Sequence, residues 1–286
     1  MDQTETGYRK YTFSSIFFFL VKWVLIIFFA VYTLFPLIWL FITSLKTNAE
    51  YFANPFSVPA VPQFSNYVNA FQKANLGRMI INSITVSAAA VFINLFAAAM
   101  AAYPIARFSF RGRELVFLLF SAGIMVPLNA LMVPYYVIFN KVGLLDSLNS
   151  LRILYAAIGL PVSTFIIRGF MESIPHEIEE AAYIDGCGFF GRFFKIVLPL
   201  TKTGLVTAGI FQFITCWNEF VYANLLTSSP NNKTIQIGIR YFTNQFTTDY
   251  VSMYAAIVIA IVPSILGYIL FQRQVISGLT SGAVKG

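Results

Sequence analysis

The chain has 286 residues, of which 58% are hydrophobic, 17% aromatic and 11% charged, and its mean hydropathy is +0.72. Soluble domains carry about 25% charged residues, and disordered chains combine low hydrophobicity with high charge, so both classes are excluded. The net charge of +7 comes without a dense Lys/Arg run, which argues against a nucleic-acid-binding protein. Two cysteines and one histidine leave no plausible zinc or iron–sulfur ligand set, so no metal and no bound cofactor are expected. The composition predicts an all-α integral membrane protein.

Six segments of the chain are long and apolar enough to cross a membrane as helices. A helix needs about 20 mostly apolar residues to span a hydrocarbon core about 30 Å thick. The segments that meet this requirement are 23–42, 79–102, 114–138, 151–170, 203–226 and 252–271. The predicted transmembrane domain therefore covers residues 23–271, between an N-terminal segment (1–22) and a C-terminal tail (272–286).

Small residues and prolines shape the predicted spans. Alanines concentrate in the span 79–102, which suits close packing between helices. Prolines inside a helix remove a backbone donor and are expected to kink it; those in the spans are Pro36, Pro104, Pro127, Pro134, Pro161 and Pro263.

Lys and Arg residues are distributed unequally between the two sides of the predicted bundle. Most of the 19 fall on the side of the N-terminus, and the short loop from Arg107 to Arg113 contributes to this excess. Positive residues in short loops favour the cytoplasmic side. Both termini are therefore predicted to be cytoplasmic.

The longest predicted cytoplasmic connection runs from Arg168 to Lys202 and is rich in acidic residues. Its pattern predicts two short helices, with Ser173 as the first N-cap and Gly186 as the left-handed residue that ends that helix. Its apolar stripe is expected at Ile174, Ile178, Ala181 and Ala182. Four phenylalanines follow, namely Phe189, Phe190, Phe193 and Phe194. They require burial, so the loop either folds back under the bundle or inserts into another protein.

The acidic loop also carries a recognisable motif. Glu180-Ala181-Ala182 is followed by Asp185-Gly186 and then by Leu198-Pro199, and this pattern resembles the EAA loop of binding-protein-dependent ABC importer permeases. Further motifs in the same order resemble the carbohydrate, maltose-permease-like branch of that family: Asn82-Ser83-Ile84, Ala102-Tyr103, Met125-Val126-Pro127, Trp217-Asn218-Glu219-Phe220 and Gly278 to Gly286. Cys187 stands where the family usually has a small alanine.

This resemblance implies a type I ABC importer permease fold, with a cytoplasmic coupling helix in the loop 171–200. In that family the coupling helix sits in a cleft of a cytoplasmic ATPase. Glu180 would meet the ATPase, Ala181 would permit close approach and Gly186 would make the turn. The other expected coupling residues are Glu177, Ala182, Asp185, Phe189 and Phe190. The tail residues expected to reach toward the ATPase dimer are Gly278, Gly282 and Lys285, with a frayed C-terminus as the alternative.

The resemblance also implies partners. They are a second permease subunit, two ABC ATPase subunits, an external solute-binding protein and the lipid bilayer of a bacterial cytoplasmic (inner) membrane. The sequence has no Gly-x-x-x-x-Gly-Lys-Ser/Thr motif and no nucleophile set, so it predicts no catalysis by this chain. ATP and Mg²⁺ are expected on the partner ATPase.

A solute pathway is predicted where polar residues lie inside the spans. Asn129 and the segment Trp217–Glu219 share a depth of roughly two-thirds of the membrane at 1.5 Å per residue. Asn129, Trp217, Asn218, Glu219 and Tyr222 together supply the amides, carboxylate and aromatic rings that bind sugars. The alternative is that these residues join helices and that the partner permease carries the substrate contacts. The outer loop 227–250 either faces the solute-binding protein or is a solvated connector.

The predicted function is the permease subunit of an importer for a carbohydrate, an oligosaccharide or related glycoside. Three alternatives stay open: an ABC importer for another polar solute such as a glycerol phosphate, an ion-coupled secondary transporter, and a membrane-embedded enzyme. The lack of a large set of basic residues that could line a cavity in the spans argues against the first alternative. The acidic loop argues against the second, and the absence of paired intramembrane acids against the third.

Overall fold

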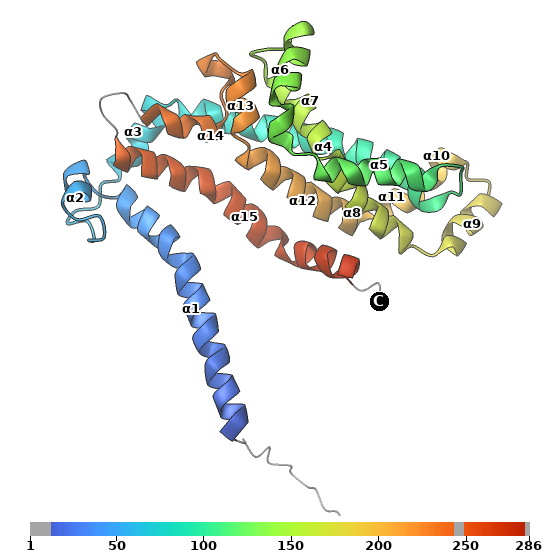
Figure 1. Cartoon of the computed structure of the whole chain (residues 1–286), viewed down its shortest axis with the longest axis horizontal. Helices are drawn as coiled ribbons and strands as arrows, with labels where there is room; N and C mark the ends of the chain where they lie inside the picture. Colours follow the sequence, from blue (N-terminus) through green and yellow to red (C-terminus); the bar gives the residue numbers. More distant parts are fainter. Residues whose placement is uncertain (1–12, 243–248, 284–286) are drawn as a thin grey trace, which may run out of the picture.

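The computed structural model describes residues 13–242 and 249–283, and every regular element in these ranges is helical (Figure 1). The helices in chain order are α1 (Phe13–Ser44), α2 (Asn48–Ala53), α3 (Ser65–Lys73), α4 (Leu76–Arg107), α5 (Arg113–Met125), η1 (Leu128–Leu131), α6 (Met132–Lys141), α7 (Leu148–Ile158), α8 (Leu160–Glu172), α9 (His176–Ile184), α10 (Phe189–Arg192), the π-helical turn η2 (Phe193–Val197), α11 (Leu198–Leu200), α12 (Lys202–Asn218), α13 (Val221–Leu226), η3 (Pro230–Asn232), α14 (Ile235–Gly238), η4 (Ile239–Phe242) and α15 (Tyr250–Ala283).

Three of the described helices are long and apolar enough to cross a membrane unbroken, and they correspond to the first, second and last predicted spans. Their apolar stretches are Phe17–Ser44, Leu76–Arg107 and Tyr250–Gln272. Three further pairs of helices pass the same test only together, because each pair is sharply bent. The described residues therefore hold up to six spans if each bent pair crosses the membrane once.

The kinks expected from prolines in the spans 114–138 and 151–170 are confirmed at Pro127 and near Pro161, and they are sharp enough to divide each segment into two helices. The axes on either side of the first break differ by 93°, and those on either side of the second by 47°. Pro127 lies in the first break, and Gly159 with Pro161 forms the second. Proline lacks a backbone donor and clashes with the preceding turn, so the chain changes direction at these points. The other span prolines, Pro36, Pro104, Pro134 and Pro263, lie within helices.

The ends of the last two predicted spans also differ from the structure. Helix α12 stops at Asn218, eight residues before the predicted end of the fifth span at 226, and α13 begins a new direction after Phe220. Helix α15 continues past residue 271 to Ala283, so most of the predicted C-terminal tail is helical. Gly278 and Gly282 lie within α15, and Lys285 lies outside the described residues.

Helix α4 is the centre of the bundle and packs against α7, α8 and α12 (Figure 1). Four of the alanines that were expected to permit close packing are buried, namely Ala90, Ala98, Ala99 and Ala102, whereas Ala88 is exposed. At the other end of α4, the Asn82 amide donates to the carbonyls of Asn231 and Lys233 at 2.8 and 2.9 Å. Helix α4 thus joins the loop after α13 to the opposite end of the molecule, where α9 lies (Figure 1).

Helix α1 stands apart from this bundle. It touches α15 near its C-terminal end and then projects away, as Figure 1 shows. None of the residues in its most apolar window is buried within the chain. Apolar side chains on this scale require lipid or another protein as cover.

Asp146 anchors the connection between α6 and α7 to the loop after α13. Its carboxylate accepts hydrogen bonds from the Ser229 hydroxyl, from the N–H groups of Ser228 and Ser229 at 2.9 Å, and from the Asn232 amide at 3.3 Å. These bonds, above all those from Ser229, hold the pKa of the Asp146 carboxyl well below its usual range. The ionised side chain therefore stabilises the fold of these two loops.

Replacing Asp146 with asparagine should lower the thermal stability of the protein at neutral pH. A carboxyl whose pKa is depressed by folding contributes stability above its unfolded pKa of about 4 and loses it as the pH falls through the folded pKa. Thermal unfolding of the detergent-solubilised protein should therefore show a gap between wild type and Asp146→Asn that narrows below about pH 4. Asp185→Asn, at an exposed carboxylate, is the control. A gap that is independent of pH would contradict the assignment.

Candidate functional site

The acidic loop folds into α9 followed by the shorter α10, as the sequence predicts, with one difference at its start. His176 opens α9 directly after Pro175, and the Ser173 hydroxyl donates to the Phe170 carbonyl at 2.7 Å instead of capping the helix. The predicted N-cap is therefore wrong, because Ser173 still belongs to the last turn that leaves α8. Gly186 has a φ of +83°, so the predicted left-handed turn is confirmed.

One face of α9 is docked on the end of α4 through a buried ion pair. The Glu179 carboxylate accepts from the Arg107 guanidinium and from the Tyr103 hydroxyl, the latter at 2.9 Å. Arg107 also donates to the carbonyl of Ile174 at 2.7 Å, just before α9 begins. The side chains of Arg107 and Glu179 are 1% and 7% exposed. A charge pair this deeply buried holds α9 rigidly relative to α4 because either charge alone would be costly to bury.

The opposite face of α9 is free. Glu177, Glu180, Ala181 and Asp185 are exposed, whereas Ala182 is buried in the chain beside Glu179. The predicted apolar stripe is therefore split between the two faces, with Ile174 buried and Ile178 exposed. The free face ends in the large apolar side chains of Tyr183 and Ile184, which are 67% and 84% exposed.

The sequence left open whether the four phenylalanines after α9 fold back under the bundle or are free to contact another protein, and the structure shows both arrangements. Phe193 is buried and its ring lies 5.1 Å from that of Tyr103. Phe189 also contacts Tyr103, at 5.2 Å, but remains partly exposed, as does Phe194. Phe190 is 66% exposed. The loop thus folds back in part and presents an apolar edge beside the free face of α9.

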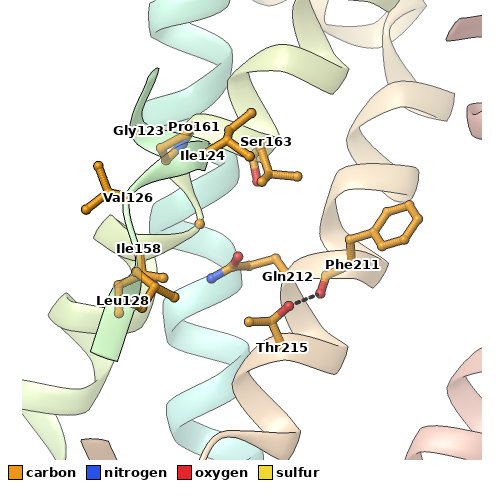
Figure 2. Close-up of a pocket in the computed structure, with 12 residues that line it drawn as sticks. Gly123, Ile124, Val126, Leu128, Ile158, Pro161, Ser163, Phe211, Gln212 and Thr215 are labelled. Atoms are coloured by element: carbon orange, nitrogen blue, oxygen red, sulfur yellow. Dashed lines mark hydrogen bonds between the residues drawn. The ribbon is translucent and has the colours of Figure 1, made fainter. Parts of the chain in front are cut away.

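Helix breaks surround two adjoining pockets in the middle of the bundle. The larger, of about 210 Å³, lies where α5, the α7–α8 break and α12 meet (Figure 2). The smaller, of about 100 Å³, lies beside the break between α12 and α13 and is lined in part by Asn129, Glu219 and Tyr222. Both pockets are lined by Leu128, Ile158, Gln212 and Thr215.

Glu219 explains why α12 ends where it does. Its carboxylate accepts from the backbone N–H groups of Tyr222 at 2.8 Å and of Ala223 at 3.0 Å, which are otherwise unpaired at the start of α13. The Tyr155 hydroxyl from α7 donates to the same carboxylate at 2.5 Å. The Tyr222 hydroxyl in turn donates to the Leu128 carbonyl at the α5–η1 break. One set of hydrogen bonds therefore fixes these helix breaks relative to each other.

Gln212 is a pocket residue that the sequence interpretation missed. Its side-chain amide donates to the Tyr155 carbonyl at 2.7 Å, and its carboxamide lies against the backbone of Gly159. A Cβ at Gly159 would lie 1.8 Å from Gln212 Oε1, so only glycine permits this approach. Figure 2 shows Gln212 and Thr215 on the α12 side of the pocket. An uncharged polar residue within a span was the available signal.

The five predicted pathway residues do not all converge on these pockets. Asn129, Glu219 and Tyr222 do, and the latter two are held by hydrogen bonds within the chain. Trp217 is buried against α15, where its indole N–H donates to the Ala260 carbonyl at 2.9 Å. Asn218 is exposed and donates to the Ile214 carbonyl one turn earlier. Trp217 therefore packs helices together, the alternative role considered for it.

The described residues contain no group of three or more His, Cys, Asp or Glu side chains placed to hold a metal ion. Cys187 and Cys216 are both free thiols. The chemistry available in the pockets is that of amide, hydroxyl, phenol and thiol groups and one carboxylate, that of Glu219, among mostly aliphatic side chains.

Comparison with known proteins defines the class. Residues 93–277 match the family described as the binding-protein-dependent transport system inner membrane component. This match covers more than half of the chain, and the chain belongs to that family. The resemblance stated from the motifs is thereby confirmed.

Curated relatives narrow the class to particular transport systems. The chain is 37% identical over 254 residues to the sulfoquinovosyl glycerol transport system permease protein SmoH of Agrobacterium fabrum, a match that covers 88% of this chain and 89% of the relative. It is 33% identical to the diacetylchitobiose uptake system permease protein NgcG of Streptomyces coelicolor, covering 91% and 87%. It is also 33% identical to the trehalose transport system permease protein SugB of Mycobacterium tuberculosis, covering 89% and 93%.

The fold is that of a solved transporter. The chain superposes with a TM-score of 0.82 on a chain of a bacterial ABC transporter involved in the import of the acidic polysaccharide alginate. The match covers 94% of this chain and 99% of the other at 24% sequence identity, so it shows a shared fold.

The two neighbouring glutamates of α9 should behave differently when replaced. Glu179→Ala leaves the Arg107 charge buried without its partner, which typically costs about 3–5 kcal/mol. Glu180→Ala removes an exposed side chain and should change stability by no more than about 0.5 kcal/mol. Denaturant unfolding of the two purified variants measures both, and equal effects would refute the buried pair as the anchor of α9.

The contribution of the Tyr155–Glu219 hydrogen bond to stability can be measured separately from the packing of the Tyr155 ring. Tyr155→Phe keeps the ring but removes a bond to a carboxylate, at a cost of about 1.5–3 kcal/mol. Tyr135→Phe is the matched control, because its ring packs on Tyr222 at 5.7 Å while its hydroxyl makes no hydrogen bond within the described part of the chain. The unfolding temperature of Tyr155→Phe should therefore be clearly lower than that of Tyr135→Phe. The reverse order would exclude a stabilising role for the Tyr155–Glu219 hydrogen bond.

Proposed function

We propose that this chain is a non-catalytic permease subunit of an ATP-driven ABC importer, and that the importer translocates an oligosaccharide or related glycoside delivered by an external solute-binding protein. The observation that carries the proposal is that α9 has one docked face and one exposed face. Its buried face is fixed to α4 by Glu179 and Arg107, and its free face presents the motif residues Glu180 and Ala181. A helix that is rigid on one side and unoccupied on the other is suited to transmit force from a partner.

The proposed membrane arrangement has six spans, with α9 and both termini on the cytoplasmic side. Three spans are unbroken helices, and two are the bent pairs α5–α6 and α7–α8. The remaining span is α12 with the end of the bent segment Phe189–Leu200 before it, whose start at Phe189 would face the cytoplasm. The cytoplasmic assignment of α9 rests on the basic loop between Arg107 and Arg113, which follows α4 at the same end of the bundle. The membrane itself would be the bacterial inner membrane, in keeping with the family description.

A second permease subunit is the proposed partner within the membrane. A wholly apolar groove of about 640 Å³ lies between α12 and α15, lined in part by Gly209, Pro263 and Gly267. Small residues along a groove permit close approach of another helix. The two pockets near the helix breaks would form one half of a pathway that the second subunit completes.

The proposed cytoplasmic partner is an ABC ATPase dimer that carries the ATP and Mg²⁺. Glu177, Glu180, Ala181, Asp185 and Gly186 would form its contact on α9, with Phe189 and Phe190 beside them. Gly278, Gly282 and Lys285 would reach it from the C-terminal end. Closure of the ATPases would move α9, and the Glu179–Arg107 pair would pass this movement to α4 and the helices around the pockets.

A carbohydrate cargo is supported by the relatives and by the chemistry of the pockets. The three relatives are named for glycoside or disaccharide transport. Asn129, Gln212 and Thr215 offer amides and a hydroxyl that suit sugar hydroxyl groups. No Lys or Arg lines either pocket, which disfavours a phosphorylated cargo such as a glycerol phosphate. The involvement of the Glu219 carboxylate in three hydrogen bonds disfavours an ion-coupled carrier.

Co-purification tests the partners. The tagged chain extracted from its native membrane in mild detergent should bring with it an ABC ATPase and a second permease. Glu180→Ala should lose the ATPase while keeping the second permease. Glu114→Ala, which removes a carboxylate 70% exposed on α5, should retain both partners. Recovery of a stable chain without any ATPase would overturn the importer assignment.

Uptake into proteoliposomes that contain the recovered complex and its binding protein tests the cargo. Radiolabelled trehalose, diacetylchitobiose and arabinooligosaccharides are the first probes, since curated relatives are named for them. Uptake of one or more that requires ATP and the binding protein supports the assignment, and uptake of glycerol phosphate alone would refute the carbohydrate cargo.

A further inference from the structure

The segment that runs from the end of α2 to the start of α3, residues 51–64, has a composition unlike that of an ordinary water-exposed loop. Residues 51–64 contain no Asp, Glu, Lys or Arg. Five of their apolar side chains are each at least 64% exposed, namely Phe52, Phe56, Val58, Val61 and Phe64. A contiguous apolar surface of this kind marks a contact with lipid or protein.

The backbone of this segment is fixed by polar side chains from its N-terminal side. The fully buried Lys46 donates through Nζ to the carbonyls of Asn54 at 3.0 Å and Pro55 at 2.8 Å. The Glu50 carboxylate accepts from the Ala60 N–H at 3.0 Å. The chain thus satisfies its own charged groups internally and turns its apolar side chains outward. This arrangement would be unfavourable in water, so the segment is built for an apolar surrounding.

The segment lies at the level where two membrane-crossing helices end. It is separated from the end of α1 by residues 45–50, and α2 packs beside the first turns of α15 (Figure 1). Tyr51 stacks on Tyr250 at 5.3 Å and shares a hydrogen bond with Tyr254. Trp39, near the end of α1, donates through its indole N–H to the Pro55 carbonyl at 3.0 Å. Trp and Tyr rings with a polar end are enriched at the membrane–water interface.

We propose that residues 51–64 form an interfacial anchor that inserts its apolar side chains among the lipids of the outer leaflet. The anchor is continuous with the exposed apolar surface of α1, and it has no charged group with which to select a protein partner. The non-helical backbone of residues 54–64 keeps the anchor at the headgroup level, because irregular backbone is not tolerated in contact with the hydrocarbon core. The assignment to the outer leaflet rests on the proposed orientation of the importer; the lipid contact does not.

Nitroxide scanning of the assembled importer in lipid nanodiscs tests this anchor. Single labels are attached at Phe56→Cys and Val61→Cys in a chain that carries Cys187→Ser and Cys216→Ala. Collision rates with oxygen, which concentrates in lipid, and with nickel ethylenediaminediacetate, which stays in water, report the surroundings of each label. Both labelled sites are exposed side chains, so folding is not at risk.

Two control positions bracket the expected result. Val31→Cys lies on the exposed surface of α1, and Asn231→Cys lies on an exposed, polar outer loop. The anchor predicts that Phe56 and Val61 labels collide with oxygen several-fold more than with nickel, at a depth between the two controls. Nickel access equal to that at Asn231 would place the segment in water and overturn the proposal. Low access to both reagents would show a protein cover, and would overturn it equally.

The experiment is independent of transport. Lipid contact is measured whether or not a sugar is taken up and whether or not an ATPase is recovered. A failure of the importer assignment and a failure of the anchor would therefore be recognised separately.

Discussion

The buried pair of Arg107 and Glu179 is the interaction on which the rest of this structure depends. It joins α9, which carries the Glu180-Ala181-Ala182 motif, to α4, the helix that packs against α7, α8 and α12. Both charges lie out of water, so the pair holds only while its geometry is intact. The Tyr103 hydroxyl is a second donor to the Glu179 carboxylate, and the Tyr103 ring packs against that of Phe193. Without this pair the motif on α9 would be attached by a short turn alone, and movement of α9 would not reach the membrane helices.

A second polar network has the same logic in the middle of the bundle. Each helix break exposes backbone groups that the membrane cannot solvate. Glu219, Tyr222 and Gln212 satisfy such groups, and in doing so they tie together helices that are distant in sequence. The pockets exist because the helices bend away from one another at these joints. Glu219 and Tyr222, which the sequence assigned to solute binding, therefore stabilise the helix breaks that form the pockets.

The sequence was informative wherever one residue type determines one local geometry. The unbroken helices α1, α4 and α15 follow from continuous apolar stretches. The left-handed turn after α9 follows from the glycine at position 186. The bends at Pro127 and near Pro161 were expected from proline, but their angles and directions were not, because hydropathy on both sides of each break is the same and carries no direction. Glu179 and Glu180 are chemically identical neighbours, and only docking on α4 decides which one is buried. Trp217 was assigned to the pathway from its depth along the span, but depth along a helix does not say which face a side chain occupies.

The length of helix α4 is constrained by the attachments at its two ends. Asn82 holds the loop after α13 at one end, and Arg107 holds α9 at the other. These two residues are about seven turns apart at 3.6 residues per turn, so they point in nearly the same direction from the helix axis. Adding or deleting one residue between them would rotate one end by about 100° relative to the other and break one of the two attachments. Insertions can accumulate in the connecting loops, whereas the number of residues along this helix is fixed by helical phase.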